Sequence, residues 1–162
     1  MKLEDKVKRP ILNIDKIDSS NIHFKKIVDN YSRWIGGNEE ITELENEIRL
    51  CFKSNDDDDG YKLAKHLESE VGIEPDTNLV EILDNIGYTK KYLELDMYKQ
   101  WVTENFLEIP SDVIGKFVKS KSRYHTREGY INNIYNNTYQ VTINTDFNKK
   151  GGYVINYEDI VV

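Results

Sequence analysis

The hydrophobic period of the chain changes once, close to residue 112. Before that point apolar side chains recur three and four residues apart, which is the spacing of one face of an α-helix. After it they alternate with polar side chains, which is the spacing of a half-buried β-strand. Because the two patterns do not interleave, the sequence predicts an α+β protein, with an N-terminal helical bundle followed by a small antiparallel β-structure.

The helical part divides into five predicted helices. The first has its apolar stripe at Phe24, Ile27, Val28, Tyr31 and Ile35. The later stripes run from Ile41 to Phe52, from Leu63 to Val71, from Leu79 to Ile86 and from Tyr92 to Val102. We expect Gly36-Gly37 to end the first helix, because glycine tolerates the left-handed conformation that follows a helix. We expect Thr77 and Thr89 to cap the last two helices, and Gly87 to separate them.

The remaining part contains four or five short predicted strands. They include Val113–Val118, Gly129–Tyr135, a strand around Val141, and Tyr153–Tyr157. Asn136-Asn137 predicts a tight turn, since asparagine tolerates positive φ. This many short strands in so few residues predict a small curled β-barrel. We therefore divide the chain into a helical domain, 1–110, and a β-barrel domain, 111–162.

Charge is distributed unevenly between these two predicted domains. Residues 1–110 hold 15 basic and 24 acidic side chains, net −9, and residues 111–162 hold 7 basic and 5 acidic, net +2. The whole chain carries −7. That balance disfavours a protein that coats DNA, because such binding neutralises phosphates with Lys and Arg. It is compatible with binding a larger basic protein.

The single cysteine and the polar N-terminus bear on the compartment. Cys51 has no partner for an internal disulfide or a cysteine-based zinc site, and its place on an apolar stripe predicts a small buried hydrophobe. Residues Met1–Asn13 lack the apolar stretch of a signal peptide, and no apolar run approaches the ~20 residues that span a bilayer. We therefore expect a reducing cytoplasm.

One acidic run stands between two predicted helices, namely Asp56, Asp57, Asp58 and Asp59, followed by Gly60. Its spacing partly matches a calcium-binding EF-hand loop, but His66 stands where that loop needs a bidentate glutamate. A solvated acidic loop is therefore favoured over a calcium site. The alternative function is an acidic contact for a basic partner, and these four residues are our candidate partner-binding residues in the helical domain.

One basic loop precedes the predicted hairpin, and its cations are Lys119, Lys121, Arg123 and Arg127. Cations around an aromatic side chain can contact phosphates or stack on bases. An ordinary solvated hairpin loop is the favoured alternative. If the loop is functional, its target is nucleic acid or an acidic face of a protein.

The sequence lacks the motifs of an active site. There is no nucleophile elbow, no phosphate-binding glycine loop and no dinucleotide fingerprint, and His23, His66 and His125 do not have the spacing of metal ligands. We expect no catalytic residue, no cofactor and no metal. An enzyme of unrecognised type is the less favoured alternative, and it requires a pocket with strongly perturbed ionisable groups.

Several segments resemble small accessory proteins of phages and mobile elements from AT-rich Gram-positive bacteria. The helical segments that carry the resemblance are Ala64–Glu68, Gly72–Asp76, Leu79–Asp84 and Trp101–Asn105. The β segments are Ile114–Val118, Gly129–Ile131 and Tyr153–Ile160, which resemble the SH3-like barrel that follows the helices in those proteins. Some proteins of that setting are type II-A anti-CRISPR inhibitors of Cas9. The resemblance thus implies an SH3-like barrel and a stoichiometric inhibitor without catalytic residues.

The functional hypothesis that follows is a phage-borne protein that inhibits a Cas9-type defence nuclease by protein–protein contact in the host bacterial cytoplasm. Its partner would be a larger basic protein, since such nucleases hold nucleic acid in positively charged channels. The alternative is a nucleic-acid-binding accessory protein that uses the basic loop of the β-barrel.

Overall fold

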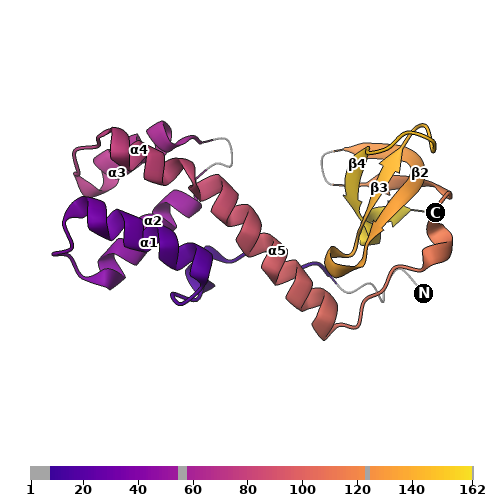
Figure 1. Ribbon diagram of the computed structural model, residues 1–162, viewed down its shortest axis with the longest axis horizontal. Coiled ribbons are helices and arrows are strands. Elements are labelled where there is room, and N and C mark those ends of the chain that lie inside the picture. The colour runs from indigo at the N-terminus through magenta and orange to yellow at the C-terminus, as the bar shows by residue number, and fades with distance from the viewer. Residues whose placement is uncertain (1–7, 55–57, 123–124, 162) are drawn as a thin grey trace. The chain divides into compact units, whose positions relative to one another are not determined.

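The structure is a computed structural model that describes residues 8–54, 58–122 and 125–161 (Figure 1). The chain divides into two compact units, a helical unit, Ile11–Glu94, and a sheet unit that joins residues 95–161 to residues 8–10. The predicted order of helices followed by an antiparallel sheet in an α+β protein is confirmed. The units differ from the predicted domains, 1–110 and 111–162, in two respects. The boundary between them falls inside the last helix, after Glu94, and residues 8–10 belong to the sheet unit.

The helical unit begins with a short 3-10 helix, η2 (Ile14–Lys16). Its α-helices are α1 (Ile22–Ile35), α2 (Ile41–Phe52), α3 (Gly60–Val71), α4 (Thr77–Asp84) and the first part of α5 (Ile86–Glu104). Most of the predicted stripe residues of α1 to α4 meet in one core, in which Phe24, Tyr31, Leu44, Ile48 and Leu67 are completely buried. The stripe predicted for the last helix is wrong in its first half, because Tyr92 and Leu95 are exposed and Leu93 is buried instead. Cys51 is also buried in this core, as predicted, and burial raises the pKa of its thiol to about 12.

The ends of α1 follow local rules that are visible in the sequence. The Asn21 side chain accepts hydrogen bonds from the backbone N–H groups of His23 and Phe24, which satisfies two donors of the first turn. Gly36 ends the helix with φ of 102°, in the left-handed region that favours glycine. The predicted end of the first helix is therefore confirmed.

The predicted boundary between α4 and α5 is wrong. Asp76, rather than Thr77, caps α4, because its carboxylate accepts the Leu79 N–H. The break comes at Asn85, whose side-chain amide donates to the Glu81 carbonyl. Gly87 lies inside α5 at a φ that is not in the left-handed region, so the glycine does not end a helix there.

The sheet unit contains five antiparallel strands in the order β4-β3-β2-β1-β5 (Figure 1). They are β1 (Phe117–Lys121), β2 (Thr126–Tyr135), β3 (Gln140–Asn144), β4 (Tyr153–Asn156) and β5 (Ile160–Val161). The short 3-10 helices are η3 (Ser111–Val113), η4 (Asn136–Thr138) and η5 (Tyr157–Asp159). Among the described strands no pairing joins β4 to β5, so the sheet is open and the predicted closed barrel is not confirmed.

Two local predictions in this unit need correction. The segment predicted as a strand, Val113–Val118, begins as the end of η3, and β1 starts only at Phe117. The predicted Asn136-Asn137 turn is a turn of 3-10 helix, and the positive φ of 54° falls on Tyr139 instead of an asparagine. The sheet unit has its own core, which contains Ile109, Val113, Ile131, Val141, Ile143 and Ile155.

Arg9 connects the N-terminal residues to the rest of the sheet unit. Its guanidinium bonds to both carboxylate oxygens of Glu158 and donates to the Tyr139 carbonyl at 2.9 Å. The same group lies over the rings of Tyr98 and Trp101, at 4.7 and 4.9 Å from their centroids. Because α5, the residue that follows η4, and η5 each supply part of this site, one side chain joins three segments that are far apart in sequence.

None of the described helices combines the length and the apolar character that a helix needs to cross a lipid bilayer.

We predict that Arg9→Ala destabilises the sheet unit by about 3–5 kcal/mol, because it leaves a nearly buried carboxylate without its cation. Arg9→Lys retains the charge but loses the planar donor pair. Its free energy of unfolding should therefore lie between those of the wild type and Arg9→Ala. Urea unfolding of the full chain measures both, with the exposed Lys8→Ala as the matched control. Equal midpoints for Arg9→Ala and Lys8→Ala would show that the guanidinium is dispensable.

Candidate functional site

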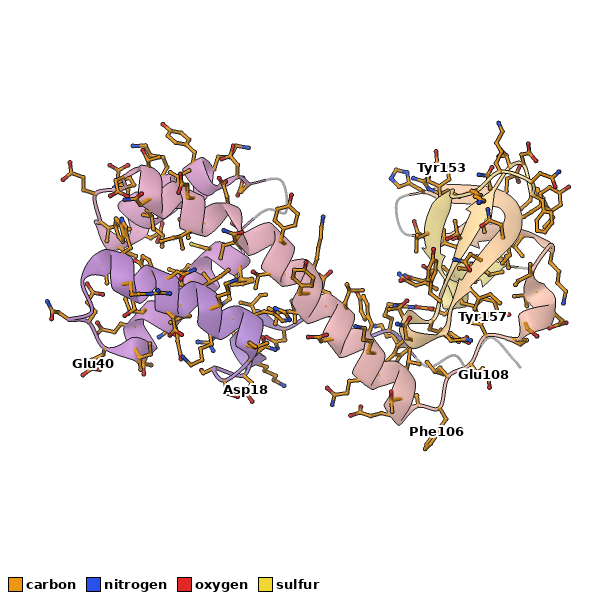
Figure 2. All side chains as sticks on the ribbon, viewed as in Figure 1. Asp18, Glu40, Phe106, Glu108, Tyr153 and Tyr157 are labelled. Atoms are coloured by element: carbon orange, nitrogen blue, oxygen red, sulfur yellow. The ribbon has the colours of Figure 1, made fainter. Side chains whose placement is uncertain are left out.

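The first candidate surface lies where α1 ends and α2 begins. Four glutamates, which we call the acidic end, stand there: Glu39, Glu40, Glu43 and Glu47. The first three are exposed, and Glu47 is partly buried (Figure 2 labels Glu40). Within the described part of the chain, none of the four forms an ion pair with a cation. Repulsion between like charges without counter-ions costs stability, of which the positive N-terminal end of α2 offsets only a part. Such costs are expected where a surface serves an interaction.

Glu40 illustrates this cost at a single position. It occupies the N-cap of α2, but its side chain makes no capping hydrogen bond. Serine, threonine, aspartate and asparagine are the residues that stabilise this position, and they do so by accepting a backbone N–H. The carboxylate of Glu40 therefore remains in solvent, at the end of a helix that would be more stable with another residue.

Tyr31, a buried residue of α1, contacts the acidic end at Glu47. Its hydroxyl donates to the Glu47 carboxylate at 2.5 Å. Burial raises the pKa of Glu47, the hydrogen bond from Tyr31 lowers it, and the charges of Glu39 and Glu43 raise it further, so that the net direction is upward. Burial also raises the pKa of Tyr31, followed by its contact with Glu47. Glu47 is thus electrostatically coupled to Glu39 and Glu43.

A stacked pair of rings extends this support to α4. The Tyr31 and Trp34 rings lie 5.9 Å apart between centroids and are almost parallel. The Trp34 indole N–H donates to the Asp76 carboxylate at 2.8 Å. Because Asp76 also caps α4, the pKa of Asp76 is lowered, first by the Leu79 N–H and then by Trp34. The buried Tyr31 ring and the half-buried Trp34 ring therefore position two carboxylates, those of Glu47 and Asp76, against the packed helices.

The structure describes only the second half of the acidic run that the sequence predicts as a partner-binding segment. Asp56 and Asp57 lie outside the described residues. Asp59 caps α3 by accepting the Lys62 N–H at 2.9 Å, and Asp58 lies 3.9 Å from the Lys62 amine. These two carboxylates stabilise the start of α3, as side-chain caps and the helix dipole favour. Among the described residues there is no group of three or more His, Cys, Asp or Glu side chains that could hold a metal ion.

The structure does not bring the described cations of the basic loop together. Lys119 pairs with Glu128 at 3.2 Å across the ladder. Arg127 lies over the Tyr153 ring, 3.6 Å from its centroid. Lys121 is exposed at the end of β1, and Arg123 lies outside the described residues. Residues 119 and 127 thus each have a partner within the sheet unit, which leaves less free charge in the loop than the sequence suggested.

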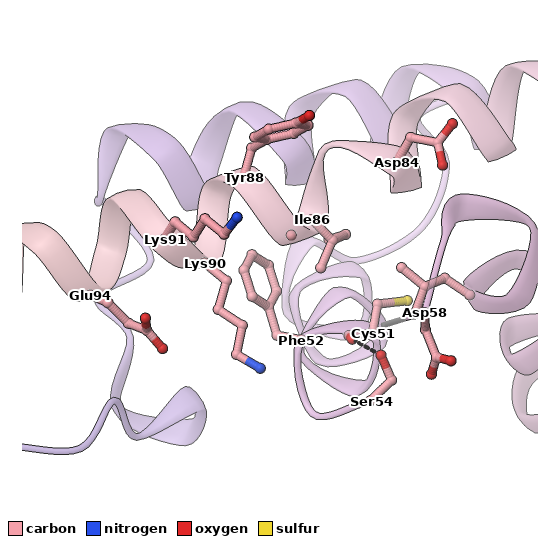
Figure 3. A pocket seen from close by; sticks show the side chains of 12 residues that line it. Cys51, Phe52, Ser54, Asp58, Asp84, Ile86, Tyr88, Lys90, Lys91 and Glu94 are labelled. Carbon is pink, nitrogen blue, oxygen red and sulfur yellow. Dashed lines mark hydrogen bonds between the residues drawn. The ribbon is translucent and has the colours of Figure 1, made fainter. Parts of the chain in front are cut away.

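The helical unit has a pocket of about 280 Å³ between the end of α2, the start of α3 and the start of α5 (Figure 3). Its polar groups take part in local bonds. The Ser54 hydroxyl donates to the Cys51 carbonyl at 2.6 Å, and Asp84 accepts the Gly60 N–H at 2.6 Å. The Cys51 thiol, with its raised pKa, is a weak nucleophile at neutral pH. In the described lining we see no base placed to activate it.

A second surface, which sequence reasoning missed, lies on the outer face of the sheet. Three aromatic rings make edge contacts there, and we call them the aromatic face: Phe117, Tyr130 and Phe147. Phe117 and Tyr130 are directly opposite each other in the β1–β2 ladder. The signal available in the sequence was the aromatic residue at an outward position of β1 and of β2, where alternation calls for a polar one; Phe147 lies in the β3–β4 loop and gave no such signal.

Comparison with known proteins places this chain in no family. No family model, no curated protein and no solved structure matches it. Function is therefore inferred from the residues themselves and their arrangement.

We predict that Glu47→Gln gains stability relative to the wild type as pH rises. Folded Glu47 holds its proton more tightly than the unfolded chain does, so the wild type loses stability as pH rises from the ordinary 4.5 through the raised pKa. Glutamine cannot ionise and avoids this loss, while its carbonyl still accepts from Tyr31. Urea unfolding at pH 4 and pH 7 measures the difference, with exposed Glu81→Gln as the control. A free energy of unfolding of Glu47→Gln that falls relative to that of the wild type between pH 4 and pH 7 would contradict the prediction.

Proposed function

We propose that this protein is a non-catalytic, stoichiometric inhibitor that binds a basic surface of a nucleic-acid enzyme through the acidic end of its helical unit. The observation that carries the proposal is the group of four glutamates without an ion pair among the described residues, in which Glu47 accepts from the buried Tyr31 and is coupled to Glu39 and Glu43. Residues 11–94 hold 19 acidic and 10 basic side chains, net −9, so the wider unit reinforces the local field. Complementary fields of this kind accelerate association and select the partner.

The target class we propose is a Cas9-type defence nuclease of a bacterial host. Such enzymes hold nucleic acid in positively charged channels, where a rigid negative body competes with the phosphate backbone. The resemblance of residues 64–105 to helical segments of small phage accessory proteins supports the same choice. An inhibitor of this kind acts where its target acts, which is the host cytoplasm.

The sheet unit, in this proposal, is an SH3-like barrel. Its support is the strand order β4-β3-β2-β1-β5, in which the first and last strands are neighbours, together with the short η5 helix directly before β5. The register of β2 against β3 shifts between Ile131 and Asn133, and such a bulge bends a long strand so that a sheet can curl. The alternative function, nucleic-acid binding by the basic loop, has less support, because Lys119 and Arg127 are engaged within the unit.

The proposal predicts that binding depends on where the negative charge lies as well as on its amount. Glu39→Gln, Glu40→Gln and Glu43→Gln together should weaken binding to the target nuclease by about tenfold or more, mostly through slower association. The matched control removes three exposed carboxylates elsewhere in the helical unit, by Glu70→Gln, Glu74→Gln and Glu81→Gln. It changes net charge equally and should alter binding by less than about threefold.

The measurement is biolayer interferometry on a panel of purified Cas9-type nucleases at low and physiological salt, followed by a DNA cleavage assay with increasing inhibitor. Inhibition should be complete near one inhibitor per nuclease. Absence of binding to every nuclease at low salt would defeat the choice of target. Equal losses for the two triple variants would defeat the acidic end as the binding surface.

A further inference from the structure

The aromatic face is an unusual surface for a sheet that needs only one buried side. Phe117, Tyr130 and Phe147 are 51 %, 37 % and 45 % exposed. The Phe117 and Tyr130 ring centroids are 5.1 Å apart, and those of Tyr130 and Phe147 are 6.5 Å apart. Outward positions of a half-buried sheet normally carry polar residues, and contiguous exposed apolar side chains mark interaction sites. The three rings therefore form a continuous exposed platform, in which neighbouring rings are turned 74° and 68° from each other, so that each ring presents its own edge or face to solvent.

A groove of about 310 Å³ adjoins this platform at Phe147. Its lining includes Tyr135 from β2 and the lysines Lys149 and Lys150 from the β3–β4 loop. Tyr135 is 39 % exposed and is steadied by a hydrogen bond from the Thr142 hydroxyl at 3.2 Å. The groove thus combines exposed aromatic rings with two ammonium groups that neighbour each other in the chain.

Asn132 holds this groove in shape. Its side-chain amide donates to the carbonyls of Lys149, at 3.0 Å, and Gly151, at 2.8 Å. Both bonds tie the β3–β4 loop to the middle of β2, close to the bulge. The oxygen of the same amide is buried and has no hydrogen-bond partner among the described residues, although it belongs to a residue that lines the groove. The lysines and Phe147 are therefore carried by a loop that is fixed before any ligand arrives, which lowers the entropic cost of binding.

The charges around the groove favour a polyanion. Within the described part of the chain, Lys149 and Lys150 have no ion pair. Asp146 lies in the same loop, but its carboxylate accepts the Asn148 N–H in a local turn. Residues 95–162 hold eight basic and eight acidic side chains, so this unit lacks the excess negative charge of the helical unit. Proline-rich peptides also bind aromatic grooves, but neighbouring free lysines favour phosphates over a peptide of that kind.

We propose that the aromatic face and its groove bind single-stranded nucleic acid. Bases stack on Phe117, Tyr130 and Phe147, and Lys149 and Lys150 contact the phosphates between them. Duplex bases are stacked on one another and cannot reach these rings, so single strands are preferred. This site is separate from the acidic end, and it stands whether or not the proposed nuclease is the partner.

The test is fluorescence anisotropy with the full-length protein and labelled 15-nucleotide oligothymidine and oligouridine, compared with a 15-base-pair duplex. Single strands should bind more tightly than the duplex. Phe147→Ala should weaken binding by about fivefold or more, because it removes one stacking surface. Phe106→Ala is the matched control, since Phe106 is 93 % exposed and lies outside the platform, and it should leave binding unchanged.

The lysines are tested by their salt dependence. Lys149→Ala with Lys150→Ala should weaken binding and reduce the slope of log affinity against log salt by about 1.4, or about 0.7 for each phosphate that the protein no longer neutralises. The control pair, Lys26→Ala with Lys99→Ala, removes two exposed lysines elsewhere and should retain the slope.

Four outcomes would overturn the proposal. They are no binding to either oligonucleotide at 50 mM salt, equal affinity for single strand and duplex, equal effects of Phe147→Ala and Phe106→Ala, and an unchanged salt slope in the double lysine variant. Binding of a proline-rich peptide that displaces the oligonucleotide from wild type would likewise assign the groove to a peptide. Thermal melting of each variant confirms that the sheet unit is still folded.

Discussion

The sheet unit depends on the burial of one charge pair. The side chains of Arg9 and Glu158 are 11 % and 13 % exposed, and removing both charges from water carries a cost of several kcal/mol. That cost is recovered only if the remaining donors and faces are also used. The Tyr139 carbonyl and the rings of Tyr98 and Trp101 meet most of this condition, while Arg9 Nη1 is buried without a hydrogen-bond partner among the described residues. Trp101 and Tyr139 then pack edge to face, so the ionic contact and the aromatic contacts of this region support each other.

The two units present surfaces of opposite chemical character. In the helical unit the unusual feature is charge: glutamates that repel one another and a glutamate where a capping residue would be more stable. In the sheet unit it is apolar area, three rings on the side that could be polar. Both features contribute less to the stability of the fold than other residues at the same positions would. Departures from local folding rules of this kind are expected where a surface meets another molecule, which is why we place recognition there.

Sequence reasoning succeeded where a structural rule acts over a few residues. The stripe of α1 was predictable because burial on a helix follows its period, and the end at Gly36 because of its left-handed backbone. The capping role of Asp59 was equally accessible, since it precedes the start of α3, but its place in an acidic run drew the interpretation toward binding. Gly87 failed as a boundary because a glycine ends a helix only if its φ becomes positive.

Contacts across the chain were beyond the reach of the same reasoning. The Arg9–Glu158 pair joins residues 149 positions apart, and no periodic pattern indicates it. The aromatic face depends on register, since Phe117 meets Tyr130 only because β1 and β2 pair as they do. The predicted basic loop failed to gather for a related reason: alternation along β2 turns Arg127 to the side of the sheet where Tyr153 lies, away from Lys119.

The separation of Arg9 from Glu158 has a consequence for how the protein is made. On the ribosome, the first residues emerge long before the carboxylate that will neutralise Arg9 has been synthesised. At about 5–20 residues per second, the intervening 149 residues take roughly 7–30 s. The residues of the helical core are all synthesised within that interval, whereas the sheet unit cannot secure Arg9 until Glu158 has been made. A nascent chain cut short before Glu158 therefore leaves Arg9 without this carboxylate, which exposes truncated products to the proteases of the cell.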